Sequence, residues 1–277
     1  MRPVSRFRRM TDGTGSAKLQ VFQSAEELGL QLADRLLSEI ARARESGRRF
    51  LLGCPTGRTP RPTYSAIARR LGSKPQDLSH VTLVMMDEYA VENGHRFAHA
   101  PFDEPWSCHH FARREMIDPW NERLPTNLQL SPTSVWFPEA EKPEVYDLRI
   151  ASAGGVDFFI LASGASDGHV AFNPPGTARD SRTRIVALSE QTRHDNLQTF
   201  PGFGTIDAVP RHGVSVGIAT ISAARKAVMV LTGTGKRESL SRVVEADQYD
   251  STWPATVIHE FSNGEILADR EAASALR

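Results

Sequence analysis

The chain has 277 residues, of which 40% are hydrophobic and 24% charged, a composition that excludes an intrinsically disordered protein and allows one substantial core. Lys plus Arg and Asp plus Glu are equal at 33 each, so there is no net charge to attract nucleic acid or an anionic membrane. The two cysteines are too few for a disulfide framework, and no apolar run approaches the roughly 20 residues of a membrane span. We therefore expect a cytoplasmic protein.

The N-terminal segment over residues 1–17 is basic, and it lacks both an apolar face and the apolar stretch of a secretory signal. We expect a disordered tail there, followed by a single domain over residues 18–277. Ser24 and Glu27 then form a capping box, and apolar residues recur at helical spacing up to Ile40. These features predict an amphipathic helix that ends before Gly47.

Short apolar runs alternate with polar segments along the rest of the chain. Residues 50–52 are such a run, and after a loop rich in Gly and Pro, Pro60 suits the first turn of a helix. Further apolar runs of the strand type are residues 81–86, 156–162, 214–218 and 227–231. Strands that alternate with helices predict an α/β fold, with a Rossmann-like, mostly parallel sheet and helices on both faces. Ligands bind such sheets beyond the carboxyl ends of the strands.

Residues 90–145 show no clear period and contain many Pro, Trp and His residues. We expect a helix around residues 111–117 within long loops, an arrangement that would suit a lid. This stretch holds the residues that might otherwise suggest a metal site, namely His95, His99, Cys108, His109 and His110. Their spacing matches no common zinc pattern, so we expect no metal.

The loop over residues 53–60 links a predicted strand to a predicted helix. It contains the sequence Thr56-Gly57-Arg58-Thr59. Free backbone amides and the dipole of a following helix favour a bound phosphate at such a position. An ordinary strand-to-helix turn explains the same residues, because Gly-rich turns are common.

Two further segments carry acids beyond the end of an apolar run. Asp87 and Glu88 follow residues 81–86, where loss of water raises the pKa of a carboxyl group toward the range useful for proton transfer. A cap or turn is the alternative role for Asp87. Asp167-Gly168-His169 follows residues 156–162 and places an acid and an imidazole on one turn, where they can shuttle protons. A purely structural histidine is the alternative there.

Four motifs follow one another along the chain: Pro55-Thr56-Gly57-x-Thr59-Pro60, Met86-Asp87-Glu88-Tyr89, residues 167–173 and Ser181-Arg182-Thr183-Arg184. Taken together, and in this order and spacing, they resemble the glucosamine-6-phosphate deaminase (isomerase) family. The resemblance extends from about Leu19 to nearly the C-terminus. The wider superfamily includes 6-phosphogluconolactonases, which share the acid after the strand and the Asp-Gly-His turn. Ala171-Phe172-Asn173 looks more like a deaminase, which makes a lactonase the second hypothesis.

This resemblance implies that Asp87 moves a proton between C1 and C2 of an open-chain aminosugar phosphate, while His169, oriented by Asp167, opens the ring. The residues that would hold the phosphate are Thr56, Gly57, Thr59 and Lys236. An enzyme of this kind needs no cofactor. Its partner is a small-molecule sugar phosphate rather than nucleic acid or a membrane, and the question of a homo-oligomer is left open.

The chain departs from the family at two positions. Pro174 stands where deaminases usually carry a glutamate that completes the ring-opening group, and Gln198 stands where they usually carry an arginine on the substrate phosphate. Arg58 replaces a glycine of the loop, and its guanidinium could supply the missing charge. The substrate could therefore differ from glucosamine 6-phosphate. The missing glutamate slightly favours the lactonase, and a non-catalytic sugar-phosphate sensor is a third hypothesis.

Overall fold

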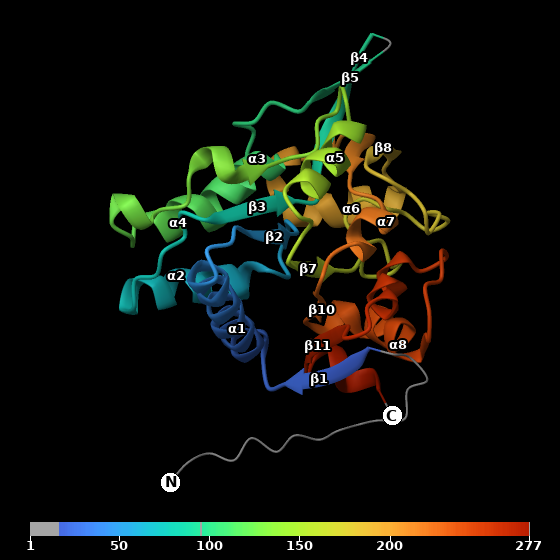
Figure 1. Ribbon diagram of the computed structural model, residues 1–277. Helices are drawn as coiled ribbons and strands as arrows, with labels where there is room; N and C mark the ends of the chain where they lie inside the picture. The colour runs from blue at the N-terminus through green and yellow to red at the C-terminus, as the bar shows by residue number, and fades with distance from the viewer. Residues whose placement is uncertain (1–16, 95, 277) are drawn as a thin grey trace.

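The computed structural model describes residues 17–94 and 96–276 of the chain (Figure 1). The tail expected over residues 1–17 falls, apart from Ala17, outside the described residues, and so does His95. No helix within the described ranges is long and apolar enough to cross a membrane. The disorder expected for the tail therefore stays a prediction.

Within the described ranges, seven parallel strands form the large sheet, in the order β1-β11-β10-β7-β2-β3-β6 (Figure 1). Their bounds are β1 (Lys18–Phe22), β11 (Glu265–Asp269), β10 (Ala227–Leu231), β7 (Phe158–Ala162), β2 (Phe50–Cys54), β3 (Val81–Met85) and β6 (Val135–Trp136). Every residue of β2, β3 and β10 is buried, because both faces of the sheet are covered. The predicted α/β fold with a Rossmann-like parallel sheet is confirmed.

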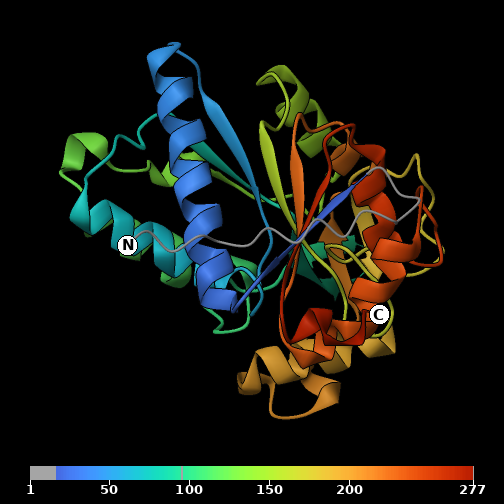
Figure 2. The same cartoon turned by 90° about the horizontal axis from the view of Figure 1, so that it is seen from below.

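Helices lie on both faces of this sheet, as Figure 2 shows. Their bounds are α1 (Ala25–Glu45), α2 (Arg61–Ser73), α3 (Cys108–Ala112), α4 (Asp118–Asn121), α5 (Glu144–Ser152), α6 (Glu190–Thr199), α7 (Ile218–Ser222) and α8 (Arg237–Glu245). Side chains alternate between the two faces along each strand. Leu52 accordingly belongs to the core that contains α1 and α2, whereas Leu51 belongs to the core that contains α5, α7 and α8.

The first helix begins as the sequence predicts. Ser24 is its N-cap, and the Ser24 hydroxyl accepts a hydrogen bond from the Glu27 amide at 3.2 Å. Short helical turns connect the other elements, at Thr126–Leu128, Pro132–Ser134, Pro201–Phe203, Ile206–Ala208, Thr234–Lys236 (η6), Pro254–Glu260 and Ala272–Ala275. Helix α2 follows Pro60, which confirms the predicted start of that helix.

A second, antiparallel sheet in the order β5-β4-β9-β8 was not predicted. Its strands are β4 (Asp87–Asn93), β5 (Arg96–His99), β8 (Arg184–Ala187) and β9 (His212–Ser215). The prediction of a single strand over residues 214–218 is wrong, because β9 ends at Ser215 and Ile218 begins α7. A buried strand and a buried helix start both require apolar residues, so the composition of this run could not separate them.

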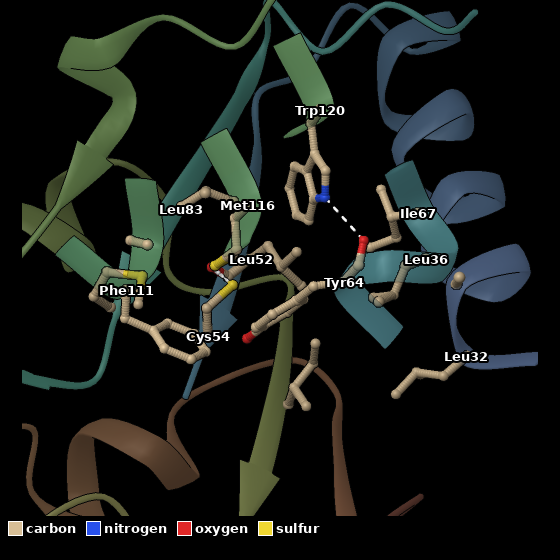
Figure 3. Packing of buried hydrophobic residues seen from close by; sticks show 14 of the residues in the cluster. Leu32, Leu36, Leu52, Cys54, Tyr64, Ile67, Leu83, Phe111, Met116 and Trp120 are labelled. Carbon is tan, nitrogen blue, oxygen red and sulfur yellow. Dashed lines mark hydrogen bonds between the residues drawn. The ribbon is translucent and has the colours of Figure 1, made fainter. Parts of the chain in front are cut away.

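The stretch from residue 108 to residue 121 is helical over a longer range than predicted. α3 passes into a π-helical segment at Arg113–Ile117 and then into α4. Trp120 of α4 is buried, and its Nε1 donates to the Tyr64 carbonyl oxygen at 3.1 Å (Figure 3). This stretch is therefore packed into the core beside α2 rather than lying within long loops.

Candidate active site

The segments singled out in the sequence meet at one edge of the large sheet. Strands β10, β7, β2 and β3 are neighbours, and the carboxyl ends of parallel strands lie at the same edge. The loop over residues 55–60, called here the phosphate loop, follows β2, and Asp87 follows β3. The turn with Asp167 and His169 follows β7, and η6 with Lys236 follows β10.

A hydrogen bond from a core residue fixes the start of the phosphate loop. Tyr64 of α2 is fully buried, and its hydroxyl donates to the Pro55 carbonyl oxygen at 2.8 Å. Figure 3 shows the Tyr64 ring pointing toward Cys54 at the end of β2. Gly57 has a φ of +95°, a conformation that a residue with a side chain rarely adopts. Helix α2 has no side-chain cap, but its Arg61 amide donates to the Arg58 carbonyl oxygen at 3.3 Å, so an anion would bind the amides of the loop itself.

Two cations flank this loop. Lys236 donates to the Ser163 carbonyl oxygen at the end of β7, and the side chain of Arg58 is exposed. Burial lowers the pKa of Lys236, the charge of Asp195 raises it, and the charge of Arg58 lowers it. The charge of Arg58 therefore acts on Lys236.

Asp87 is the first residue of β4, and only 4% of its surface is exposed. Burial raises the pKa of its carboxyl group to about 7, and the charge of Glu88 raises it as well, while a hydrogen bond from Cys108 lowers it. The Cys108 thiol donates to Asp87 Oδ1 at 3.4 Å. A carboxyl group with this pKa can both accept and return a proton near neutral pH.

Glu88, the neighbouring acid, has a different environment. Its Oε1 accepts the amides of Tyr89 (2.7 Å) and Cys108 (3.0 Å). Its Oε2 accepts the His109 amide at 2.9 Å and lies 2.6 Å from His109 Nδ1. Both oxygens are therefore used to hold the start of α3, which leaves Asp87 as the acid suited to proton transfer.

The Asp167–His169 pair lies across the same edge. Asp167 Oδ1 is 2.7 Å from His169 Nδ1 and also accepts the His169 amide at 3.2 Å. Ser189 donates to Asp167 Oδ2 at 3.0 Å. Burial raises the pKa of Asp167, but the hydrogen bond and charge of His169 outweigh burial and lower the pKa to about 2. Asp167 is therefore ionised and fixes the imidazole through Nδ1, which turns Nε2 toward other partners.

Glycine is required beside this pair. A Cβ at position 164 would lie 2.2 Å from Asp167 Oδ1 and 2.3 Å from His169 Nδ1. Gly168 has a φ of +65°, and a Cβ there would lie 2.3 Å from the Trp253 ring. The turn after β7 can therefore adopt its shape only with glycine at both positions.

The structure also shows where the two departures from the family pattern, Pro174 and Gln198, lie. Asn173 is buried, and its amide donates to the Val170 and Val216 carbonyl oxygens at 3.0 and 2.7 Å. Pro174, which follows it, offers no carboxylate. Gln198 is exposed near the end of α6.

Sequence reasoning missed the part played by Cys108. It considered this residue only as a metal ligand, whereas the structure places the thiol against Asp87 and 3.7 Å from Thr56 Oγ1. No group of three or more metal-binding side chains comes together within the described residues. A hydrogen bond between residues 21 positions apart leaves no local pattern, and the only available signal was the capping Ser107 before α3.

Comparison with known proteins agrees with this geometry. The family described as glucosamine-6-phosphate isomerases/6-phosphogluconolactonase matches residues 23–267. A protein named glucosamine-6-phosphate deaminase from Streptomyces avermitilis is 36% identical over 227 residues, which cover 82% of this chain and 82% of that protein. Another of that name from Shouchella clausii is 30% identical over 249 residues, covering 90% of this chain and 93% of that protein.

Solved structures show the same relationship. A monomeric glucosamine-6-phosphate deaminase has a TM-score of 0.78 at 30% sequence identity, covering 93% of this chain and 99% of that chain. A 6-phosphogluconolactonase from Trypanosoma brucei shares the fold, with a TM-score of 0.65 at 19% identity, covering 94% of this chain and 99% of that chain. On the evidence of the matched residues and of these relatives, the chain belongs to the family of glucosamine-6-phosphate isomerases and 6-phosphogluconolactonases.

Proposed function

We propose that this protein is a glucosamine-6-phosphate deaminase, which converts an aminosugar phosphate and water into a ketose phosphate and ammonia. The observation that carries the proposal is the buried carboxyl group of Asp87, whose pKa of about 7 suits reversible proton transfer at the edge that also holds the Asp167–His169 pair. Relatives at 30% and 36% identity over most of the chain bear this name, which supports the same activity.

Ring opening is assigned to His169. Because Asp167 occupies Nδ1, the Nε2 atom is the one that meets the sugar. It takes the proton of the anomeric hydroxyl and returns a proton to the ring oxygen, which gives the open-chain aldehyde. The ionised Asp167 stabilises the imidazolium that exists between these two transfers.

Isomerisation is assigned to Asp87. Its carboxylate takes the proton from C2 of the open chain and delivers it to C1, while a proton of the amine passes to the C1 oxygen. The aldehyde thus becomes a hydroxymethyl group, and the carbon–nitrogen bond at C2 becomes an imine. Water adds to this imine, and ammonia leaves with the proton balance restored, giving the ketose. The proton transfer needs a base that is ionised in part of the molecules near neutral pH, which the raised pKa of Asp87 provides.

Phosphate binding is assigned to the phosphate loop and the two cations beside it. The backbone amides of Thr56, Gly57 and Thr59 and the hydroxyl of Thr59 provide donors, and Lys236 and Arg58 provide charge. A phosphate held here lies beyond the carboxyl end of β2, with Asp87 and His169 at the ends of the two neighbouring strands.

Hydrolysis of a sugar-phosphate lactone is the second candidate function. The observation that favours it is Pro174, which supplies no carboxylate to the ring-opening histidine. In that reaction His169 would act as a base on water, and no C2 proton would move. A role for Asp87 in proton transfer would then be unnecessary.

Ammonia release from glucosamine 6-phosphate, measured beside hydrolysis of 6-phosphogluconolactone, tests the proposal. We expect ammonia release by the parent protein, and its loss in Asp87→Asn, which keeps the size of the side chain. Asp118→Asn is the matched control, because Asp118 is solvent-accessible and paired only with Arg113 at 3.3 Å within the described residues. Lactone hydrolysis without ammonia release, or binding of the sugar phosphate without either reaction, would contradict the proposal.

A further inference from the structure

The carboxyl group of Asp87 contacts a hydrogen-bonded cluster on the side of α3. Cys108 is fully buried in this cluster, with its thiol 3.4 Å from Asp87 Oδ1 and 3.7 Å from Thr56 Oγ1. The thiol is thus in contact with both the base and the phosphate loop. The thiol therefore connects the phosphate loop, which follows β2, with Asp87, which follows β3.

The position of Cys108 is fixed by its neighbours. Glu88, which is fully buried, accepts the Cys108 amide at 3.0 Å and the His109 amide at 2.9 Å. The imidazole of His109, paired with Glu88, is stacked between Phe102 and Phe137 at centroid distances of 3.8 and 3.4 Å. The first turn of α3, and the thiol with it, therefore has little freedom to move relative to Asp87.

The direction of the hydrogen bonds follows from the number of protons. Burial raises the pKa of the Cys108 thiol well above its ordinary value, and the charges of Glu88 and Asp87 raise it as well, so the thiol keeps its proton. A thiol has a single proton to donate. Because Asp87 Oδ1 receives that proton, the Thr56 hydroxyl donates to the sulfur.

We propose that Cys108 is a positioning residue that relays hydrogen bonding from Thr56 in the phosphate loop to Asp87 and thereby sets how readily Asp87 takes a proton. A donor to the charged form of a carboxyl group favours that form. Cys108 thus offsets part of the effect of burial and keeps the base partly ionised near neutral pH. The catalytic purpose of this relay rests on the proposed function, but the relay itself exists in the free protein.

Other titratable groups also interact with Asp87, namely Glu88, Tyr89, Tyr64 and Tyr146. Burial raises the pKa of the three tyrosines well above the ordinary value, so they remain neutral. Glu88 keeps its bonds to α3 when the thiol is removed, because it binds the Cys108 backbone rather than the side chain. A change at the Cys108 thiol therefore alters the environment of Asp87 without altering these groups.

The test is an NMR titration of the Asp87 carboxyl carbon in the free protein, with the signal assigned by its absence in Asp87→Asn. Cys108→Ala removes the donor and should raise the measured pKa by roughly half to one pH unit, whereas Cys108→Ser retains a donor and should return it toward the parent value. Cys54→Ala is the matched control, because Cys54 is the other fully buried cysteine and its thiol donates to the Leu52 carbonyl oxygen. An unchanged pKa in Cys108→Ala, or an equal rise in Cys54→Ala, would overturn the proposal.

The relay from Thr56 is tested with a double-mutant cycle. Thr56→Val keeps the shape of the side chain, leaves the core in place and should raise the pKa of Asp87 by a smaller amount. In the Cys108→Ala background the same change should have no further effect, because it acts through the thiol. Equal effects in both backgrounds would contradict the relay. These titrations need no substrate, so their outcome is independent of whether the protein releases ammonia.

Activity measurements then connect the relay to catalysis. The acidic limb of the pH profile of kcat should move upward in Cys108→Ala by the same fraction of a pH unit as the titration. A merely structural role would lower kcat without moving that limb. A limb that stays in place in an active Cys108→Ala variant would therefore overturn the proposed role.

Discussion

Removal of the guanidinium in Arg58→Gly should weaken the binding of phosphorylated sugars. A charge-assisted contact to phosphate is worth about 1.5–3 kcal/mol, which corresponds to roughly 10- to 150-fold in affinity. Arg58 is exposed, so solvent screening reduces this figure and we expect about tenfold. The assay compares KM or Kd for glucosamine 6-phosphate with that for glucosamine, whose affinity should not change. Equal affinity of Arg58→Gly and the parent for the phosphorylated sugar would show that Arg58 points to solvent.

The geometry of α6 offers a rescue of this variant. Thr192 contacts Asp167, and the charge of Asp195, one turn further on, raises the pKa of Lys236. Gln198, three residues beyond Asp195, lies on the same side of the helix. An arginine there can approach the same anion, so Arg58→Gly with Gln198→Arg should recover much of the affinity. Arg58→Gln, which lacks the charge but adds no backbone freedom, separates the effect of charge from that of glycine.

Three further changes test the remaining geometry. Gly164→Ala would place a Cβ 2.2 Å from Asp167 Oδ1 and should lower turnover about 100-fold, whereas Gly202→Ala, where the nearest atom lies at 4.0 Å, should be neutral in the same assay. Asp87→Asn should stabilise the protein more at pH 8 than at pH 5, by at most about 3 kcal/mol in chemical denaturation, because the folded pKa of about 7 exceeds the unfolded value of about 4 and the cost of the buried acid grows with pH between these two values and is constant above the higher one. Tyr64→Phe should cost about 1 kcal/mol and raise KM more than it lowers kcat, since it frees the phosphate loop; a change in kcat alone would argue against this.

The parallel sheet could be predicted from the sequence because its strands are buried on both faces. Residues 227–231 form β10 as expected. The predicted run 50–52 lies within β2, and the predicted run 156–162 overlaps β7. Such strands consist of continuous apolar residues, which stand out between polar segments. The sheet edge beyond which Asp87 and His169 follow their strands could be predicted from the rule that ligands bind beyond the carboxyl ends of parallel strands.

The antiparallel sheet could not be predicted, because its strands carry mixed residues. β4 begins with two acids, and β5 contains Arg96 and His99. The pairing of β4 with β9 joins segments more than 100 residues apart, such as Asp87 with Ser215, and no local pattern records it. The link between Cys108 and Asp87 was missed for the same reason, since a loop and a hairpin separate the two residues.

β4, a strand that was not predicted, begins with Asp87 and determines the environment of its carboxyl group. An acid at the free end of β3 would be solvated and would keep a pKa near its ordinary value. Because the chain continues at once into β4, the backbone of Asp87 pairs with Ser215, and its side chain is buried against Cys108. Burial raises the pKa to about 7, the hydrogen bond from Cys108 limits that rise, and the charge of Glu88 adds to it. If Asp87 is the base of the proposed reaction, the antiparallel sheet contributes to function, because the strand that begins with Asp87 is part of that sheet and its carboxyl group is buried there.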